Sequence, residues 1–222
     1  WRASRDEKTT YSSPFIWKNS ARTELVTCGK TARSYDPLTG KLLWEMKMKG
    51  NMSIPSPIAD SEHLYIGNTG GPDAVGGFYA VQTGASGDIT PDSVTLVSQG
   101  VAWSLPEAGT GNPTPVLHNG LVYILASNGK NLKCVDAATG KIIYDQKLEK
   151  VSTCWATPWV YKDNLYICDE RGFTHIVKTG VQFEMLSQNR IRDRFWASAA
   201  IGYDAYVFKG VNKVYCVAAS PE

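Results

Sequence analysis

The three histidines and five cysteines are the residues of this chain whose chemistry would be most distinctive. Histidine is the usual general base, and both residue types bind metals. His63 and His118 lie beside predicted hairpin turns and His175 lies within a predicted strand, so we expect no common site for them. The cysteines form no CxxC spacing and no adjacent pair, so a zinc site or redox dithiol has little support. We therefore predict no catalytic and no metal-ligating residues, and we expect most of the cysteines, which are Cys28, Cys134, Cys154, Cys168 and Cys216, to be buried free thiols.

One short segment, residues 190–196, has a composition suited to binding. It mixes three arginines with Phe195 and Trp196. Arginine and tryptophan are over-represented at binding hot spots. The alternative is that Trp196 enters the core at the start of a strand while the arginines are solvated, and the sequence leaves both interpretations open.

The charge balance gives no case for a polyanionic partner. The 222 residues carry 23 basic and 21 acidic side chains, a formal charge of +2, so we expect neither nucleic acid nor an anionic membrane to bind. No apolar run is long enough to span a bilayer. The chain opens at Trp1 without an initiator Met, so we expect a processed product or an excised fragment.

A recurring phrase defines the elements that position these residues. A Ser/Thr-Pro pair followed by a β-rich stretch begins at Ser13, Ser56, Thr114 and Thr157, with a weaker copy at Ser198, at steps of about 41 to 58 residues. A period near forty residues filled with short strands and turns is typical of a β-propeller. The repeats lie at about 11–50, 53–106, 110–150, 153–193 and 196–219, within a single predicted domain.

The two ends of the chain are predicted to share a blade. Trp44 and Trp1 each precede the next Ser-Pro pair by about twelve residues, so residues 1–5 read as a fourth strand whose first three are missing. The final repeat supplies three strands and lacks the fourth. We therefore predict an all-β propeller of about five four-stranded antiparallel blades, the last completed by residues 1–5. The alternative is an open partial propeller, which we would expect to pair with another chain, including as a homo-oligomer.

Two turns carry a family motif. Residues 34–44 match the tryptophan-docking pattern Ala-x-Asp-x-x-Thr-Gly-x-x-x-Trp, with Ser for the Ala, and residues 134–144 match it with Cys for the Ala and Tyr for the Trp. The chain therefore resembles the C-terminal portion of PQQ-like, or quinoprotein-like, β-propeller repeat proteins. The resemblance implies that the aromatic residue packs between blades while the Asp and Thr order the turn. The motif residues are Asp36, Thr39, Gly40, Trp44, Asp136, Thr139, Gly140 and Tyr144.

The resemblance also implies what an active member would contain. Quinoprotein dehydrogenases of this superfamily bind PQQ and calcium in the central funnel, use an Asp as base and commonly carry a vicinal disulfide. This sequence has no matching Cys pair and no carboxylates with calcium-loop spacing. We therefore predict no cofactor, and we keep a PQQ-dependent or small-ligand oxidoreductase as the alternative.

What remains is a surface for binding. In a propeller, the loops that lead into each blade share a rim with the loops that join the second and third strands. We predict a non-enzymatic binding or scaffold module that holds a protein, peptide or glycan partner in the periplasm or outside the cell, a location that the resemblance implies. The candidate rim residues are Arg5, Lys30, Asn128, Trp155, Asp169, Arg171, Arg192, Arg194 and Trp196.

Overall fold

The chain folds into five small sheets of sequentially antiparallel strands, which we call blades 1 to 5. The computed structural model describes residues 1–222 except 8, 51, 71–74, 127–128 and 219–222. The described residues form no helix, and therefore none that could cross a membrane. The all-β prediction is confirmed.

The strands follow one another blade by blade. Blade 1 contains β1 (Phe15–Lys18), β2 (Thr23–Thr27), β3 (Thr31–Tyr35) and β4 (Leu42–Lys47). Blade 2 contains β5 (Ile58–Ala59), β6 (His63–Gly67), β7 (Phe78–Gln82) and β9 (Val101–Leu105). Blade 3 contains β10 (Val116–His118), β11 (Leu121–Leu125), β12 (Asn131–Asp136) and β13 (Ile142–Lys147). Blade 4 contains β14 (Trp159–Tyr161), β15 (Asn164–Cys168), β16 (Phe173–Lys178) and β17 (Met185–Arg190), and blade 5 contains β18 (Ala200–Gly202), β19 (Ala205–Lys209) and β20 (Val214–Ala218).

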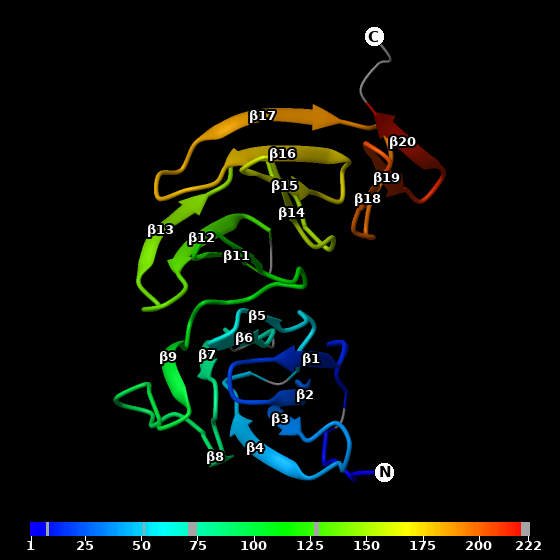
Figure 1. Ribbon diagram of the computed structural model, residues 1–222. Coiled ribbons are helices and arrows are strands. Elements are labelled where there is room, and N and C mark those ends of the chain that lie inside the picture. Colours follow the sequence, from blue (N-terminus) through cyan, green and yellow to red (C-terminus); the bar gives the residue numbers. More distant parts are fainter. Residues whose placement is uncertain (8, 51, 71–74, 127–128, 219–222) are drawn as a thin grey trace.

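The blades are arranged around an open arc. The fourth strands lie on the outside of the arc, and both chain ends lie at its open side, at opposite ends of the row of blades (Figure 1). The second repeat is the longest, and its extra residues supply β8 (Gly87–Asp88), which pairs in parallel with the outer edge of β4. The open form of the predicted propeller is therefore the one that this structure shows.

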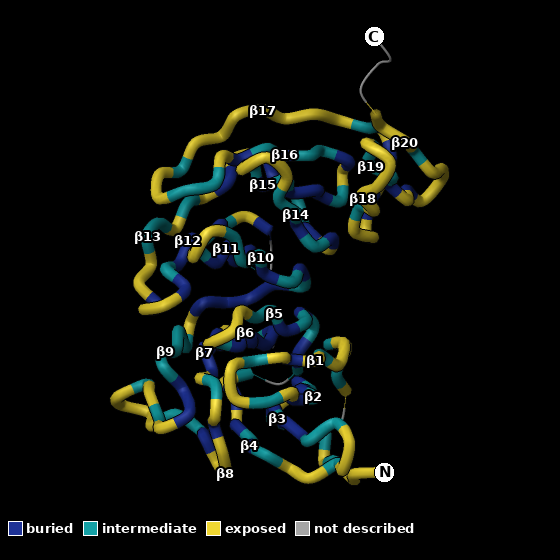
Figure 2. The backbone as a smooth tube through the Cα atoms, in the orientation of Figure 1, coloured by how far each residue is buried: buried dark blue, intermediate teal, exposed yellow. Residues whose placement is uncertain are grey.

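Apolar side chains fill the seams between successive blades. Separate buried clusters join blades 1 and 2, 2 and 3, 3 and 4, and 4 and 5. In blades 1 to 4 the second and third strands are mostly buried or half-buried, whereas β17 is exposed along its length and β20 is exposed except at Tyr215 (Figure 2). Burial of these seams is the main stabilising contribution, because each thin sheet has little core of its own.

The turn between the third and fourth strands has the same geometry in blades 1 and 3. In blade 1, Asp36 Oδ1 accepts hydrogen bonds from the amides of Leu38 (3.0 Å) and Thr39 (2.8 Å) and from the Thr39 hydroxyl (2.9 Å). In blade 3, Asp136 Oδ1 accepts the corresponding bonds from the amide and the hydroxyl of Thr139. The glycine that follows has a φ of +73° in both turns, a conformation that suits glycine because it has no Cβ.

The prediction that residues 1–5 complete the last blade is wrong. These residues form no strand, and blade 5 has three strands. The Trp1 indole instead donates to the carbonyl of Pro37 (3.0 Å), and its ring centroid lies 6.0 Å from that of Tyr35. These contacts hold the N-terminal segment on blade 1.

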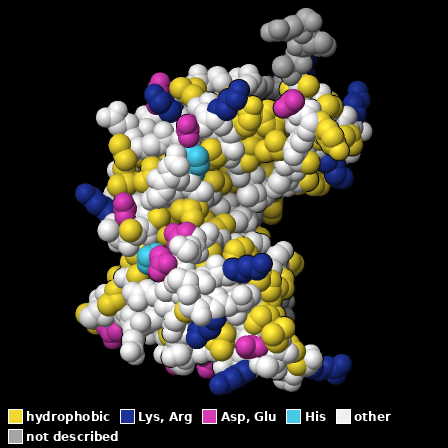
Figure 3. Space-filling model, in the orientation of Figure 1, with side chains coloured by type: hydrophobic (Ala, Val, Ile, Leu, Met, Phe, Trp, Pro, Cys, Tyr) yellow, Lys and Arg dark blue, Asp and Glu magenta, His cyan; other side chains and the backbone are white. Residues whose placement is uncertain are grey.

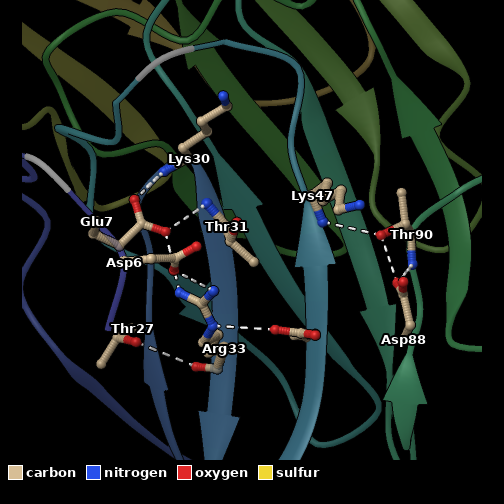
Figure 4. Close-up of polar contacts among 10 residues, drawn as sticks. Asp6, Glu7, Thr27, Lys30, Thr31, Arg33, Lys47, Asp88 and Thr90 are labelled. Carbon is tan, nitrogen blue, oxygen red and sulfur yellow. Dashed lines mark hydrogen bonds and ion pairs between the residues drawn. The ribbon is translucent and has the colours of Figure 1, made fainter. Parts of the chain in front are cut away.

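An arginine anchors the residues that follow Trp1. The Arg33 guanidinium pairs with Asp6 (2.6 Å) and Glu7 (3.2 Å), as Figure 4 shows. It also pairs with Glu45 (3.2 Å). Glu7 also accepts hydrogen bonds from the amides of Lys30 (2.8 Å) and Thr31 (2.9 Å). This network fixes the N-terminal segment on blade 1, at the opposite end of the arc from β20 (Figure 1).

Candidate functional site

The loops that were expected to form a rim do meet in the structure. In most blades, a backbone bridge joins the segment that leads into the blade to the end of its second strand. These bridges are Met52 to Thr69 in blade 2, Thr110 to Ala126 in blade 3 and Phe195 to Gly210 in blade 5. In blade 4, the Glu170 amide donates to the carbonyl of Thr153 (2.9 Å). In blades 2 to 5 the two classes of loop therefore meet at the same end of the blade.

Four side chains gather on this rim where blades 4 and 5 meet, and we call them the rim cluster: Trp155, Glu170, Arg194 and Trp196. Arg194 forms an ion pair with Glu170. The Arg194 guanidinium carbon lies 5.2 Å from the ring centroid of Trp196, within the range of a cation–π contact. The Trp155 indole N–H points to the other oxygen of Glu170, at a long 3.4 Å. Both indoles are about half exposed, at 46% for Trp155 and 51% for Trp196.

The charges of the cluster stabilise one another. The hydrogen bond from Arg194 lowers the pKa of the Glu170 carboxyl below its ordinary value, and the two indoles add to this effect. The Glu170 carboxylate therefore stays ionised near neutral pH. Because the Arg194 side chain is exposed, the ion pair adds little to the folding stability. The ion pair does orient the guanidinium beside the Trp196 indole.

Asp169 fixes the turn that carries Glu170 of the rim cluster. It is fully buried, so its predicted place as an exposed rim contact is wrong. Its carboxylate accepts hydrogen bonds from the amides of Ser152 (3.1 Å), Arg171 (2.9 Å) and Phe173 (3.0 Å), which fixes both the turn after β15 and the loop before β14. Asp169 is buried for this reason: an aspartate that caps a turn must face the backbone of that turn.

A buried histidine completes the network under the rim. His175 Nε2 lies 3.3 Å from Asp169 Oδ2, and Gln188 Nε2 lies 3.0 Å from His175 Nδ1. Burial alone would raise the pKa of Asp169, but the hydrogen bonds from His175 and the backbone amides outweigh it, and the pKa lies below its ordinary value. The carboxylate is therefore ionised at neutral pH and holds its donors.

The other predicted rim residues lie apart from the cluster or at its edge. Arg171 and Arg192 are exposed on segments next to Glu170 and Arg194. Arg5 and Lys30 belong to the blade 1 end of the arc, and two guanidinium nitrogens of Arg5 are buried without a hydrogen-bond partner among the described residues. Asn128 lies outside the described residues.

The sequence did not select Glu170 as a candidate rim residue, and it did not decide which of Phe195 and Trp196 is buried. Phe195 is the core residue of its segment, at 1% exposure, and Trp196 points outward. The interpretation of Trp196 as a core residue is therefore wrong. The pairing of Glu170 with Arg194 joins two loops 24 residues apart, and no local pattern marks such a contact.

The chemistry that this arrangement offers is recognition. Two indole faces and an oriented guanidinium can contact a partner through apolar, cation–π and hydrogen-bonding interactions. Among the described residues, no three His, Cys, Asp or Glu side chains are grouped so that they could hold a metal ion. The histidines are separate: His118 pairs with Asp163 (2.8 Å) on blades 3 and 4, and His175 is enclosed in blade 4.

Comparison with known proteins identifies the family. A family model described as Outer membrane protein assembly factor BamB, and named PQQ_2, matches residues 29–180, which is more than half of the chain. The chain belongs to this PQQ-like repeat family. The resemblance seen in the two docking motifs is thus confirmed.

Solved structures also show similarity to this member of the BamB-like family. BamB from Moraxella catarrhalis is 14% identical with a TM-score of 0.49, over 90% of this chain and 70% of that chain. The computationally designed Ika8 protein is 12% identical with a TM-score of 0.49, over 91% and 70% of the respective chains. No curated protein sequence matches this chain.

Proposed function

We propose that this BamB-like arc is a non-enzymatic scaffold that binds a polypeptide partner through the rim cluster. The observation that supports the proposal is the pair of half-exposed indoles, Trp155 and Trp196, on either side of the Arg194–Glu170 ion pair. Clustered exposed apolar side chains with a polar rim mark interaction sites, and tryptophan with arginine is the composition of binding hot spots.

The cluster suits an extended polypeptide better than a globular ligand. Its side chains come from three loops of one rim and are joined by contacts across the seam between blades 4 and 5. Each indole face would cover an apolar or proline side chain. Arg194 would donate hydrogen bonds to a carboxylate or carbonyl of the same segment, in exchange for part of its contact with Glu170. The family description, an assembly factor of the outer membrane, favours a protein partner over a glycan and a periplasmic location.

A selection experiment tests this proposal. A displayed library of random peptides would be panned against the wild-type chain, with the variant Trp155→Ala/Trp196→Ala as the counter-selection. We expect peptides that are retained by the wild type and released by the variant. The matched control is Tyr203→Ala, which removes an exposed aromatic side chain on blade 5 away from the cluster and should leave retention unchanged.

Two results would contradict the proposal. Peptides that bind the wild type and the double variant equally would place binding elsewhere. Saturable binding of PQQ with calcium, accompanied by oxidation of an alcohol or sugar, would favour the oxidoreductase alternative.

A further inference from the structure

Each of the first four blades carries a cross-strand pair at the same place in its sheet. The pair joins the third strand to the fourth, next to a register shift in the third strand. The pairs are Ser34 with Trp44, Ala80 with Trp103, Cys134 with Tyr144, and Ile176 with Ser187. The fourth-strand member is aromatic in blades 1, 2 and 3, but is a serine in blade 4.

Blade 2 shows what the aromatic residue does at this position. Trp103 is 6% exposed, and its indole donates to the carbonyl of Ala137 in blade 3 (3.0 Å). Its ring centroid lies 5.9 Å from that of Tyr65 and 6.0 Å from that of Phe78 in its own blade. The indole therefore fills the seam between the two sheets.

The corresponding place in the seam between blades 4 and 5 is hollow. A cavity of about 200 Å³ lies there, lined mainly by Trp159, Tyr166, Thr174, Ile176, Tyr206 and Phe208. By strand register Tyr166 corresponds to Tyr65, Thr174 to Phe78 and Ile176 to Ala80, because Tyr166 pairs with Ile176 as Tyr65 pairs with Ala80. Ser187 and Thr174 are both too small to fill the space that Trp103 and Phe78 occupy in blade 2.

The walls of this cavity suit an aromatic ring. Trp159 stacks on Tyr166 with ring centroids 5.4 Å apart and an interplanar angle of 10°. An apolar cavity of about 150 Å³ stays dry and binds benzene in a well-studied case, so this larger cavity has room for a planar ring. The Trp159 indole nitrogen is buried and donates no hydrogen bond with proper geometry to the described residues, so a ligand with a carbonyl would satisfy it.

The N-terminus shows that an indole can fill such a position without belonging to a sheet. Trp1 donates to Pro37 at 3.0 Å, as Trp103 donates to Ala137 at 3.0 Å, and these two acceptors each follow the turn aspartate of their blade. Trp1 belongs to a segment with no strand structure. A segment outside the sheets can therefore deliver the ring that a fourth strand delivers elsewhere.

We propose that the seam between blades 4 and 5 is a docking site for a tryptophan side chain of a partner polypeptide. The ring enters the cavity beside Trp159 and Tyr166, and a carbonyl of the peptide accepts from the Trp159 N–H. The site goes beyond the rim cluster, and it uses none of the four residues of that cluster.

The test uses N-acetyl-5-fluoro-L-tryptophanamide as the probe and ¹⁹F NMR as the measurement. The wild type is compared with Ser187→Trp, which supplies an internal indole to the cavity, and with Leu186→Trp, which adds an indole at the neighbouring exposed position. We expect saturable binding by the wild type and by Leu186→Trp, and at least a fivefold loss of affinity in Ser187→Trp together with a higher melting temperature. Because Ser187→Trp could disturb folding, Thr174→Phe fills the same cavity from the third strand and should have the same effect on binding.

Two outcomes would overturn the proposal. One is the absence of saturable binding by the wild type, and the other is unchanged binding in a folded Ser187→Trp or Thr174→Phe variant. The rim variant Trp155→Ala/Trp196→Ala should bind the probe like the wild type. A failure of the rim proposal is thus distinguishable from a failure of this one.

Discussion

Trp103 lies across the seam from Gly140, and a Cβ atom added to Gly140 would come within 2.6 Å of the indole ring. The same relationship holds at the start of the chain, where a Cβ on Gly40 would come within 2.5 Å of the Trp1 ring. Both glycines follow the motif threonine, so the glycine of the docking motif is required for the approach of an indole as well as for its positive φ.

We predict that Gly140→Ala destabilises the protein more than Gly120→Ala does. Both glycines have a φ of +73°, but nothing lies within 4 Å of a Cβ at Gly120. Gly120→Ala should therefore cost only the backbone strain, about 1–2 kcal/mol, whereas Gly140→Ala should add roughly 1–3 kcal/mol of overpacking. Urea denaturation of both variants measures the difference, and equal losses would show that the contact with Trp103 is unimportant.

We predict that Trp44→Ala lowers the free energy of unfolding by roughly 3–5 kcal/mol, as for a large buried aromatic. Trp44 is fully buried, and its indole donates to the buried carboxylate of Glu24 at 2.7 Å. The matched control is Trp155→Ala on the exposed rim, which should change stability by about 0.5 kcal/mol or less. An unchanged melting temperature for Trp44→Ala would refute its assignment to the seam.

The motif turns were predictable from the sequence because their signals are local. The Asp, Thr and Gly of residues 36–40 and 136–140 lie within one turn, and the hydrogen bonds that they form join neighbours along the chain. The repeat period likewise revealed the propeller. The docking role of Trp103 was missed because the longer second repeat places it about twenty residues after Thr83 and Gly84, where the motif spacing no longer applies.

The long-range features were not predictable in this way. By its spacing Trp1 corresponds to a fourth-strand tryptophan. Its indole does donate to the turn of blade 1, as Trp103 donates to the turn of blade 3, but residues 1–5 belong to no sheet. Register alone does not decide whether the curvature of the arc brings the two ends together. The rim cluster depends on a contact between Glu170 and Arg194, which belong to different blades.

The network under the rim should make stability depend on pH. The folded pKa of Asp169 lies below its ordinary value, so the unfolded state takes up a proton first as the pH falls. The contribution of this carboxylate is therefore complete above about pH 4, the unfolded pKa of aspartate, and is lost as the pH falls through the lower folded pKa. We expect Asp169→Asn to be less stable than the wild type at pH 7, and the gap to narrow below pH 4. A gap in urea denaturation that is the same at pH 7 and pH 3 would contradict this account.

The most direct test of the proposed function is the affinity of a selected peptide for the rim cluster. Isothermal titration of that peptide into the wild type and into Trp155→Ala/Trp196→Ala should show at least a tenfold higher Kd for the variant, with unchanged melting temperature because both indoles are half exposed. The same Kd for both proteins would contradict the assignment of the rim cluster as the binding site.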